Sequence, residues 1–169
     1  ARTINNTLTA ALATIKENND IQFIWQTGKY YYPQVTEAVR AAEELPNLYV
    51  TDFIKDMAAA YAASDLVISR AGAGSISEFC LLHKPVVLVP SPNVAEDHQT
   101  KNALALVDKQ AAIYVKDSEA EAKLMDVALN TVADDRKLKE LSENIAKLAL
   151  PDSARIIAQE VIKLAEAEN

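Results

Sequence analysis

The residues best suited to bind a ligand lie in residues 69–78 (SRAGAGSISE), where an apolar run gives way to a helical pattern. Two of the three glycines of the chain, Gly72 and Gly74, are found here. Glycine lets a backbone approach a ligand closely, and the free amides that open a helix attract phosphate oxygens. Ser75 and Glu78 also have the spacing of a capping box with Ser75 as the N-cap, which explains them equally well. A carboxylate such as that of Glu78 can in addition accept both hydroxyls of a ribose.

This segment matches neither of the two common phosphate-binding motifs. It lacks the six-residue glycine fingerprint of dinucleotide-binding folds and the Gly-Lys-Ser/Thr of a P-loop, so neither NAD nor ATP is favoured. Metal chemistry is not predicted either, because the chain has two histidines and one cysteine and no Asp-x-Asp pair. We expect His83 to mark a helix end, Cys80 to be a small core residue, and Asp134 and Asp135 to open a solvated helix.

A second polar loop follows another apolar run, at residues 90–99, and leads into a helical pattern. Its side chains His98, Gln99 and Asn102 could offer hydrogen bonds to sugar hydroxyls. The alternative is an ordinary helix start with Asp97 as the N-cap, and for an isolated loop this alternative is favoured.

A third loop, residues 51–57, enters an alanine-rich helix. Its apolar residues Phe53, Ile54 and Met57 could flank a base, with backbone groups reading the base edge. Without further information, packing of these side chains against the core is the default interpretation.

Short apolar runs rich in β-branched residues alternate with stretches of helical spacing. The predicted strands cover residues 21–25, 48–50, 66–68, 86–89 and 112–115. The predicted intervening helices cover residues 33–44, 56–63, 75–82 and 98–109. Strands that are apolar throughout and alternate with helices describe a parallel sheet covered on both faces, so the fold class is α/β with a doubly wound parallel sheet. Ligands bind beyond the carboxyl ends of such strands, where the three loops begin.

Helices are predicted at both ends of the chain. Apolar spacing from Ile4 to Ile15 predicts one first helix, and the pattern after residue 115 is helical only. The last helix places Ile157, Val161 and Leu164 on one face, and we expect this apolar stripe to be partly exposed. Packing of the helix on its own sheet is the alternative.

Composition sets limits on the function. The 169 residues are 50% hydrophobic and carry a formal net charge of −7, which fits a single compact domain and argues against a broad nucleic-acid surface. One cysteine and no apolar run of bilayer length predict a reducing, cytosolic setting. The chain starts without Met in a helical pattern, so we expect it to be a fragment.

Three segments in this order, residues 51–61, 69–78 and 97–103, resemble the MurG family of N-acetylglucosaminyltransferases. The resemblance implies a two-domain GT-B glycosyltransferase in which residues 1–169 form a single, Rossmann-like, C-terminal UDP-sugar-binding domain. It also implies that an N-terminal acceptor domain, and the first strand of this domain with a glycine-rich phosphate loop, precede Ala1.

The resemblance assigns roles to individual residues. It implies that backbone groups at Ile54 read uracil, that Glu78 holds the ribose hydroxyls, and that Ser75 and the surrounding helix start meet the α-phosphate. The pair His98 and Gln99 is implied to contact the N-acetylglucosamine ring. The same pocket is implied to be lined by Met57, Arg70, Gly72 and Gly74.

By this resemblance, the full enzyme transfers N-acetylglucosamine from UDP to the muramyl 4-hydroxyl of an undecaprenyl-linked intermediate in peptidoglycan synthesis, with inversion, at the inner face of the bacterial plasma membrane. No cofactor or metal is expected if helix-start amides stabilise the departing UDP. The general base is expected on the N-terminal domain, so no catalytic residue is assigned in this chain, and the fragment alone is expected to be inactive.

Other functions remain open at this point. Within the same architecture these are a lipid glucosyltransferase, a nucleotide-sugar epimerase and the soluble subunit of a split dolichol-linked transferase. A non-catalytic nucleotide-binding or partner module is the alternative from a different class. An acidic chain without a basic amphipathic helix offers no membrane anchor of its own.

Overall fold

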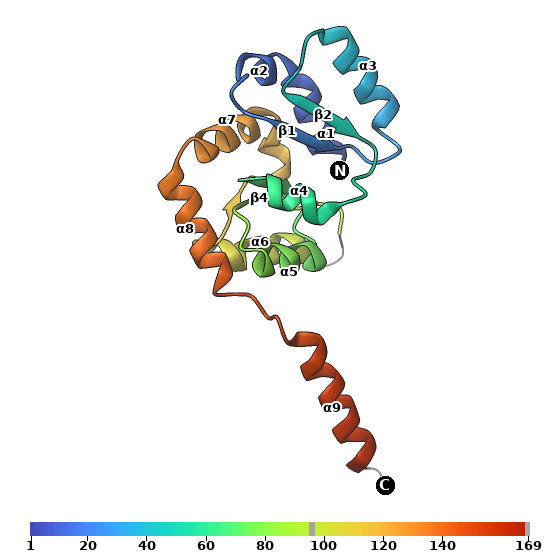
Figure 1. The fold of residues 1–169 in the computed structure, drawn as a ribbon, viewed down its shortest axis with the longest axis vertical. Coiled ribbons are helices and arrows are strands. Elements are labelled where there is room, and N and C mark those ends of the chain that lie inside the picture. The colour runs from blue at the N-terminus through green and yellow to red at the C-terminus, as the bar shows by residue number, and fades with distance from the viewer. Residues whose placement is uncertain (95–96, 168–169) are drawn as a thin grey trace.

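The computed structural model describes residues 1–94 and 97–167 as an α/β domain with one projecting helix (Figure 1). The strands are β1 (Phe23–Gln26), β2 (Leu48–Thr51), β3 (Val67–Ser69), β4 (Val86–Leu88) and β5 (Ile113–Tyr114). The helices up to β5 are α1 (Arg2–Ala10), α2 (Leu12–Glu17), α3 (Tyr32–Ala42), α4 (Met57–Ala63), α5 (Ala73–Leu81) and α6 (His98–Val107). A 3-10 turn, η2 (Asp117–Glu119), is followed by α7 (Ala120–Val132), α8 (Asp135–Ala146) and α9 (Ser153–Ala167).

Every strand pairing in the described part of the chain is parallel, as predicted. The strands form a two-stranded sheet, β1-β2, and a three-stranded sheet, β3-β4-β5. Phe23 lies opposite Leu48 in the first sheet, and Val67 lies opposite Val86 in the second. Because successive strands are joined by helices, they can run in the same direction, and their carboxyl ends then share an edge.

The β4 strand and the residue after it are buried from both sides. Val86 and Leu88 belong to a core cluster with residues of α5, α6 and α8, whereas Val87 and Val89 pack with residues of α1 and α7. All four side chains are 0% exposed. A strand with helices on both faces needs apolar residues at every position, which explains the uninterrupted run in the sequence.

The β1-β2 sheet packs on α1, α2, α3 and α7 through Trp25, which is 5% exposed. Its opposite face carries Ile24 and Tyr49, which are paired across the two strands and exposed to solvent. The predicted first helix is divided into α1 and α2 at Ala11.

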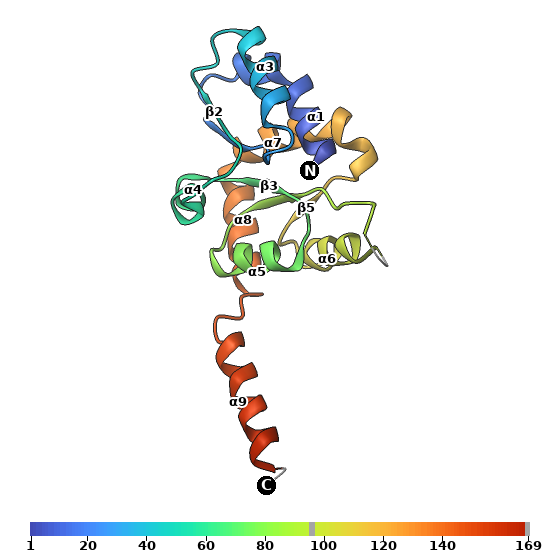
Figure 2. The same cartoon turned by 90° about the vertical axis from the view of Figure 1, so that its right-hand side faces the viewer.

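The helix α9 extends away from the rest of the domain (Figures 1 and 2). Ile157, Val161 and Leu164 are 59–68% exposed, so the prediction of a partly exposed apolar stripe is confirmed. None of the helices in residues 1–94 and 97–167 combines the length and the apolar character needed to cross a bilayer.

Asn5 is a buried polar residue that joins α1 to the end of β1. Its amide Nδ2 donates to the carbonyl oxygen of Thr27 at 2.9 Å, and its Oδ1 accepts from the indole Nε1 of Trp25 at 3.0 Å. Asn5 is 3% exposed, so both partners depend on it for their hydrogen bonds.

We therefore expect Asn5→Ala to lower the free energy of unfolding by about 2–4 kcal/mol, because it leaves one buried donor and one buried acceptor without a partner. Urea denaturation followed by the fluorescence of Trp25, the only tryptophan of the chain, measures the change. Asn6→Ala, at the exposed neighbouring position, is the matched control. Equal stability of the two variants would show that the Asn5 bonds are not stabilising.

Candidate functional site

The three loops singled out in the sequence leave the carboxyl ends of β2, β3 and β4. Side chains join the helices that follow them. The hydroxyl of Tyr61 on α4 donates to Glu78 Oε2 on α5 at 3.0 Å, and Asn102 Nδ2 on α6 donates to the carbonyl oxygen of Ala71, just before α5, at 3.2 Å. The loops that enter α4, α5 and α6 therefore surround one edge of the fold, as parallel topology predicts.

The helix α5 begins two residues earlier than predicted. Gly72 is the N-cap, with an extended backbone at φ −70° and ψ 141°, and the first helical bond joins the Ile76 amide to the Gly72 carbonyl at 3.0 Å. The capping box predicted from Ser75 and Glu78 is therefore wrong, because Ser75 is already the third residue of the helix. No side chain caps this start among the residues described.

Neither glycine at this helix start is required by the fold. A Cβ atom added to Gly72 or Gly74 would meet nothing within 4 Å. Gly28 is the only glycine with a positive φ, so backbone conformation does not demand glycine at positions 72 and 74 either. What the two glycines provide is open space at their own Cβ positions, next to the amides that start the helix.

Glu78 lies on the second turn of α5 and is exposed. Burial, followed by the hydrogen bond to Glu78 and its charge, raises the pKa of Tyr61 to about 12. The phenol is therefore protonated at neutral pH and acts as the donor. In the part of the chain that the structure covers, Glu78 Oε1 accepts no hydrogen bond, so this oxygen is available to a ligand.

The loop between β2 and α4 presents a mixed surface. Phe53 is 60% exposed, so the default interpretation of core packing is wrong for this residue, whereas Ile54 and Met57 are half-buried. The Ile54 amide donates to Gln26 Oε1, at the end of β1, at 2.8 Å. Asp56 caps α4 by accepting from the Ala59 amide at 2.9 Å.

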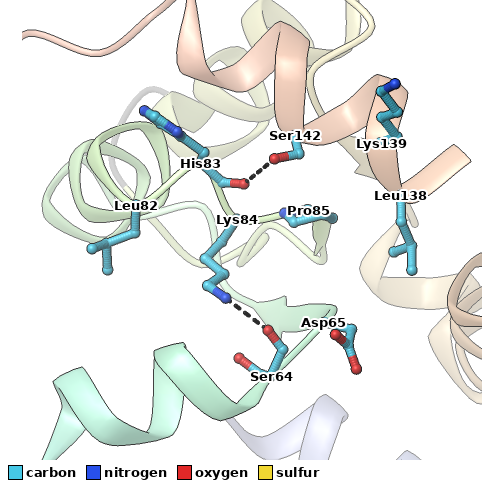
Figure 3. A pocket seen from close by; sticks show the side chains of 9 residues that line it. All are labelled: Ser64, Asp65, Leu82, His83, Lys84, Pro85, Leu138, Lys139 and Ser142. Atoms are coloured by element: carbon cyan, nitrogen blue, oxygen red, sulfur yellow. Dashed lines mark hydrogen bonds between the residues drawn. The ribbon is translucent and has the colours of Figure 1, made fainter. Parts of the chain in front are cut away.

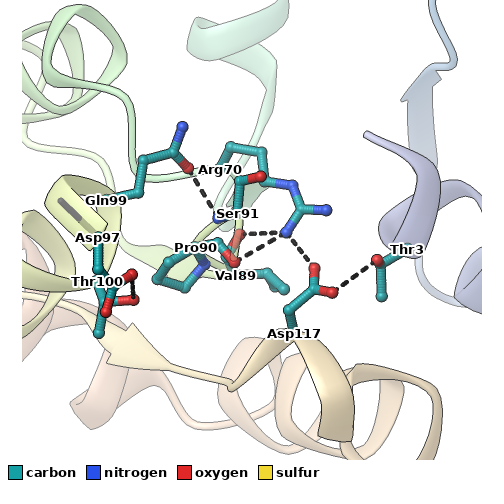
Figure 4. A network of polar contacts seen from close by, with 9 residues as sticks. All are labelled: Thr3, Arg70, Val89, Pro90, Ser91, Asp97, Gln99, Thr100 and Asp117. Carbon is teal, nitrogen blue, oxygen red and sulfur yellow. Dashed lines mark hydrogen bonds and ion pairs between the residues drawn. The ribbon is translucent and has the colours of Figure 1, made fainter. Parts of the chain in front are cut away.

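Arg70 binds groups of the protein itself (Figure 4). Its Nη1 donates to the carbonyl oxygens of Val89 and Pro90 at 2.9 and 3.0 Å and forms an ion pair with Asp117. Asp117 also accepts from the Thr3 hydroxyl on α1 at 2.9 Å. Arg70 thus holds the ends of β3 and β4 and the start of α1 together, and its contact with a ligand stays a prediction.

The loop between β4 and α6 contains the predicted sugar-binding residues. The helix begins at His98, as predicted, and His98 is exposed. Gln99 Oε1 accepts from the Ser91 amide at 2.9 Å (Figure 4), while Asn102 holds Ala71 as described above. Both side chains therefore position the loop ends in this structure. Two residues of the predicted loop, at positions 95 and 96, lie outside the described residues.

A separate hollow of about 340 Å³ lies at the opposite ends of β3 and β4 (Figure 3). Two of its polar side chains form hydrogen bonds with nearby backbone carbonyls. Lys84 Nζ donates to the Ser64 carbonyl at 2.8 Å, and the Ser142 hydroxyl donates to the His83 carbonyl at 2.7 Å. His83 follows α5 with a left-handed backbone, so the predicted helix end is confirmed. This hollow is remote from the three loops.

The structure also bears on the predictions for Asp134, Cys80 and metal binding. Asp134 caps α8 by accepting from the Arg136 and Lys137 amides, which confirms the predicted helix start. Cys80 is buried in the core, as predicted, and burial raises the pKa of its thiol. Across the described ranges, no group of three or more His, Cys, Asp or Glu residues is placed to hold a metal ion.

Sequence reasoning missed Gln26, Tyr61 and Asp117 as contacts of the site. Tyr61 gave a usable signal, because it is the one large side chain after Met57 in the alanine-rich stretch that became α4. Gln26 and Asp117 are 28 and 47 residues away from their partners Ile54 and Arg70. No pattern of spacing reveals contacts over such separations.

The sequence is similar to those of known bacterial transferases. The chain is 99% identical, over all of its 169 residues, to a UDP-N-acetylglucosamine--N-acetylmuramyl-(pentapeptide) pyrophosphoryl-undecaprenol N-acetylglucosamine transferase of Bacteroides thetaiotaomicron, of which it covers 45%. It is 51% identical to the protein of the same name from Porphyromonas gingivalis, over 99% of the chain and 44% of that protein. The chain thus spans about half the length of these relatives.

Solved structures share the fold. The crystal structure of Acinetobacter baumannii MurG superposes with a TM-score of 0.81 at 28% identity, over 96% of this chain and 46% of that one. A glycosyltransferase of kitacinnamycin superposes with a TM-score of 0.63 at 21% identity, over 88% of this chain and 34% of that one, which shows the fold alone. The glycosyltransferase family 28 C-terminal domain matches residues 1–157. The α/β fold described above is thus that of a known domain, and the chain belongs to the glycosyltransferase family 28 C-terminal domain family.

Proposed function

We propose that this chain is the UDP-N-acetylglucosamine-binding domain of a glycosyltransferase that transfers N-acetylglucosamine to an undecaprenyl-pyrophosphoryl muramyl-peptide. The observation that supports this most directly is the uncapped start of α5. Its two glycines leave open space that neither packing nor backbone conformation requires, beside a carboxylate that has one oxygen available.

The diphosphate of the donor binds at the start of α5. The amides of Gly72, Ala73, Gly74 and Ser75 precede the first helical hydrogen bond, and the residues described supply no side-chain cap for them. These amides and the positive end of the helix dipole attract phosphate oxygens. The same groups stabilise the charge that develops on UDP as the sugar departs, without a metal or another cofactor.

The uridine lies between α5 and the β2-α4 loop. Glu78 accepts the ribose hydroxyls through its available oxygen, and the exposed Phe53 ring flanks the base together with Ile54 and Met57. The Ile54 amide donates to the Gln26 amide oxygen, so a uracil carbonyl that binds this amide takes the place of a chemically similar acceptor.

The sugar lies toward the start of α6. His98 is exposed at the first position of that helix, and Gln99 and Asn102 lie within its first two turns. Gln99 uses its Oε1 for the Ser91 amide, so its amide nitrogen is the group that faces a sugar hydroxyl. Arg70 keeps the ends of β3 and β4 at the distance that places these loops around one ligand.

The rest of the enzyme supplies the acceptor site and the general base, at the inner face of the plasma membrane. We also propose that a strand before Ala1 joins the two sheets. In support, the Thr3 hydroxyl at the start of α1 donates to Asp117, the ion-pair partner of Arg70 beyond β3. Asn5 on the same helix donates to the Thr27 carbonyl beyond β1. The start of α1 therefore lies between the two sheet ends.

Glu78→Gln tests the ribose contact. We expect it to weaken UDP binding about 10-fold or more, because a hydrogen bond to a charged acceptor contributes about 1.5–3 kcal/mol. An NMR titration with UDP measures the affinity of each variant. Glu121→Gln, at an exposed position on α7, removes the same charge elsewhere and should bind UDP like the wild type. Unchanged UDP affinity of Glu78→Gln would contradict the proposal that Glu78 binds the ribose.

Gly72→Val tests the approach of the diphosphate. The backbone at Gly72 is extended and a Cβ meets nothing there, so the only expected cost is that of a poorer N-cap residue, about 0.5–2 kcal/mol of the free energy of unfolding. UDP affinity should fall at least 10-fold, because the added side chain occupies open space next to the helix-start amides. Thermal unfolding and the same titration separate the two effects. A variant that is stable and binds UDP normally would contradict the phosphate site.

The isolated chain should bind the donor and transfer nothing. Calorimetry or NMR should show tighter binding of UDP-N-acetylglucosamine than of UDP-glucose, and weaker binding of ADP than of UDP. Transfer of radiolabelled N-acetylglucosamine to a lipid-linked muramyl-peptide should be undetectable with residues 1–169 alone. Measurable transfer would show that the general base lies within this chain, and equal affinity for ADP and UDP would favour a general nucleotide-binding module.

A further inference from the structure

We infer that Tyr61 is a positioning residue for the ribose of the donor: its hydroxyl holds the carboxylate of Glu78 in the orientation that accepts the ribose diol. This inference rests on the proposed function, because it assumes that Glu78 meets the ribose. It adds a residue from α4, the helix that follows the base-binding loop, to the ribose site.

The contact joins two helices. The Tyr61 hydroxyl on α4 donates to Glu78 Oε2 on α5 at 3.0 Å, across 17 positions of sequence. An exposed glutamate otherwise samples many rotamers, and fixing such a side chain costs up to about 2 kcal/mol of conformational entropy. Since Tyr61 holds one oxygen before the ligand arrives, less of this entropy is lost on binding, and the other oxygen is presented in a defined direction.

Tyr61 is itself held firmly. Its ring packs edge-to-face on Phe79, with the ring centroids 5.8 Å apart and the planes at 90°. Phe79 is 1% exposed and belongs to the core cluster that contains β4. Phe79 also follows Glu78 directly in α5, so the ring that anchors Tyr61 and the residue whose carboxylate Tyr61 orients belong to the same helix.

The hydroxyl of Tyr61 has no role in packing. Apart from Met57 and Tyr61, α4 consists of alanine, and none of its residues is fully buried. A phenylalanine would make the same ring contact with Phe79. The hydroxyl donates only to Glu78 among the residues described, and with its pKa raised to about 12 it remains a donor at any physiological pH.

The same helix carries the base-binding loop. Phe53 and Ile54 lie within four residues of the first residue of α4, and Asp56 caps that helix. The bond from Tyr61 to Glu78 therefore fixes the loop that flanks the base relative to the carboxylate that meets the ribose. This geometry recognises a nucleoside as one rigid shape, base and ribose together.

Tyr61→Phe, titrated by NMR with UDP and with 2′,3′-dideoxy-UDP, tests the inference on the 169-residue chain. We expect the variant to bind UDP about 3- to 10-fold more weakly than the wild type, as the loss of one hydrogen bond predicts. For 2′,3′-dideoxy-UDP, which has neither ribose hydroxyl to meet Glu78, the variant and the wild type should differ by less than 2-fold. The matched control is Tyr49→Phe, which removes an exposed hydroxyl on β2 and should change neither affinity.

A purely structural role of Tyr61 gives a different pattern, with equal losses for UDP and 2′,3′-dideoxy-UDP. That result, or no loss with either ligand, overturns the inference while the proposed function stands, provided that Glu78→Gln still weakens UDP binding. If the wild type binds no UDP, or Glu78→Gln binds it normally, the proposed function fails and the inference fails with it.

Discussion

The burial of β4 between two helical layers is the constraint on which the rest of the domain depends. Its side chains alternate between the α5, α6 and α8 face and the α1 and α7 face, and none is exposed. Because β4 has no solvent face, its neighbours β3 and β5 must satisfy its backbone on both edges. The connections must then emerge at the strand ends, which gathers the polar loops at one edge.

Polar contacts hold these loops in place. The Arg70 guanidinium binds the ends of β3 and β4 and, through Asp117, the start of α1. With side-chain exposures of 20% and 18%, the Arg70–Asp117 pair is largely shielded from water, so loss of one partner would leave a poorly solvated charge. Arg70 lies in the segment that carries the family resemblance, and in this structure it holds the loop ends of the site in place.

At the start of α5, the position of the N-cap differs from the one that local sequence spacing predicts. Ser75 and Glu78 have capping-box spacing, yet Gly72 begins the helix, since an extended glycine can serve as the N-cap and Ala73 and Gly74 continue the helix. Glu78 is then free of the cap and bonds to Tyr61. The capping residues that local stability would favour are absent where a ligand is proposed to supply the acceptors.

Hydrophobic periodicity alone determined the strands, the helices and the α/β class, because burial on one or two faces imposes a repeat on the residues of each element. The order of the loops along the chain also determined that residues 51–57, 69–78 and 90–99 would meet at one edge, since parallel strands end together. Only the tertiary structure decided that the strands divide into two sheets, that Phe53 is exposed, and that Tyr61 and Gln26 contact Glu78 and Ile54. These contacts join residues far apart in the chain, and their geometry depends on how whole helices pack, which no local repeat of residues encodes.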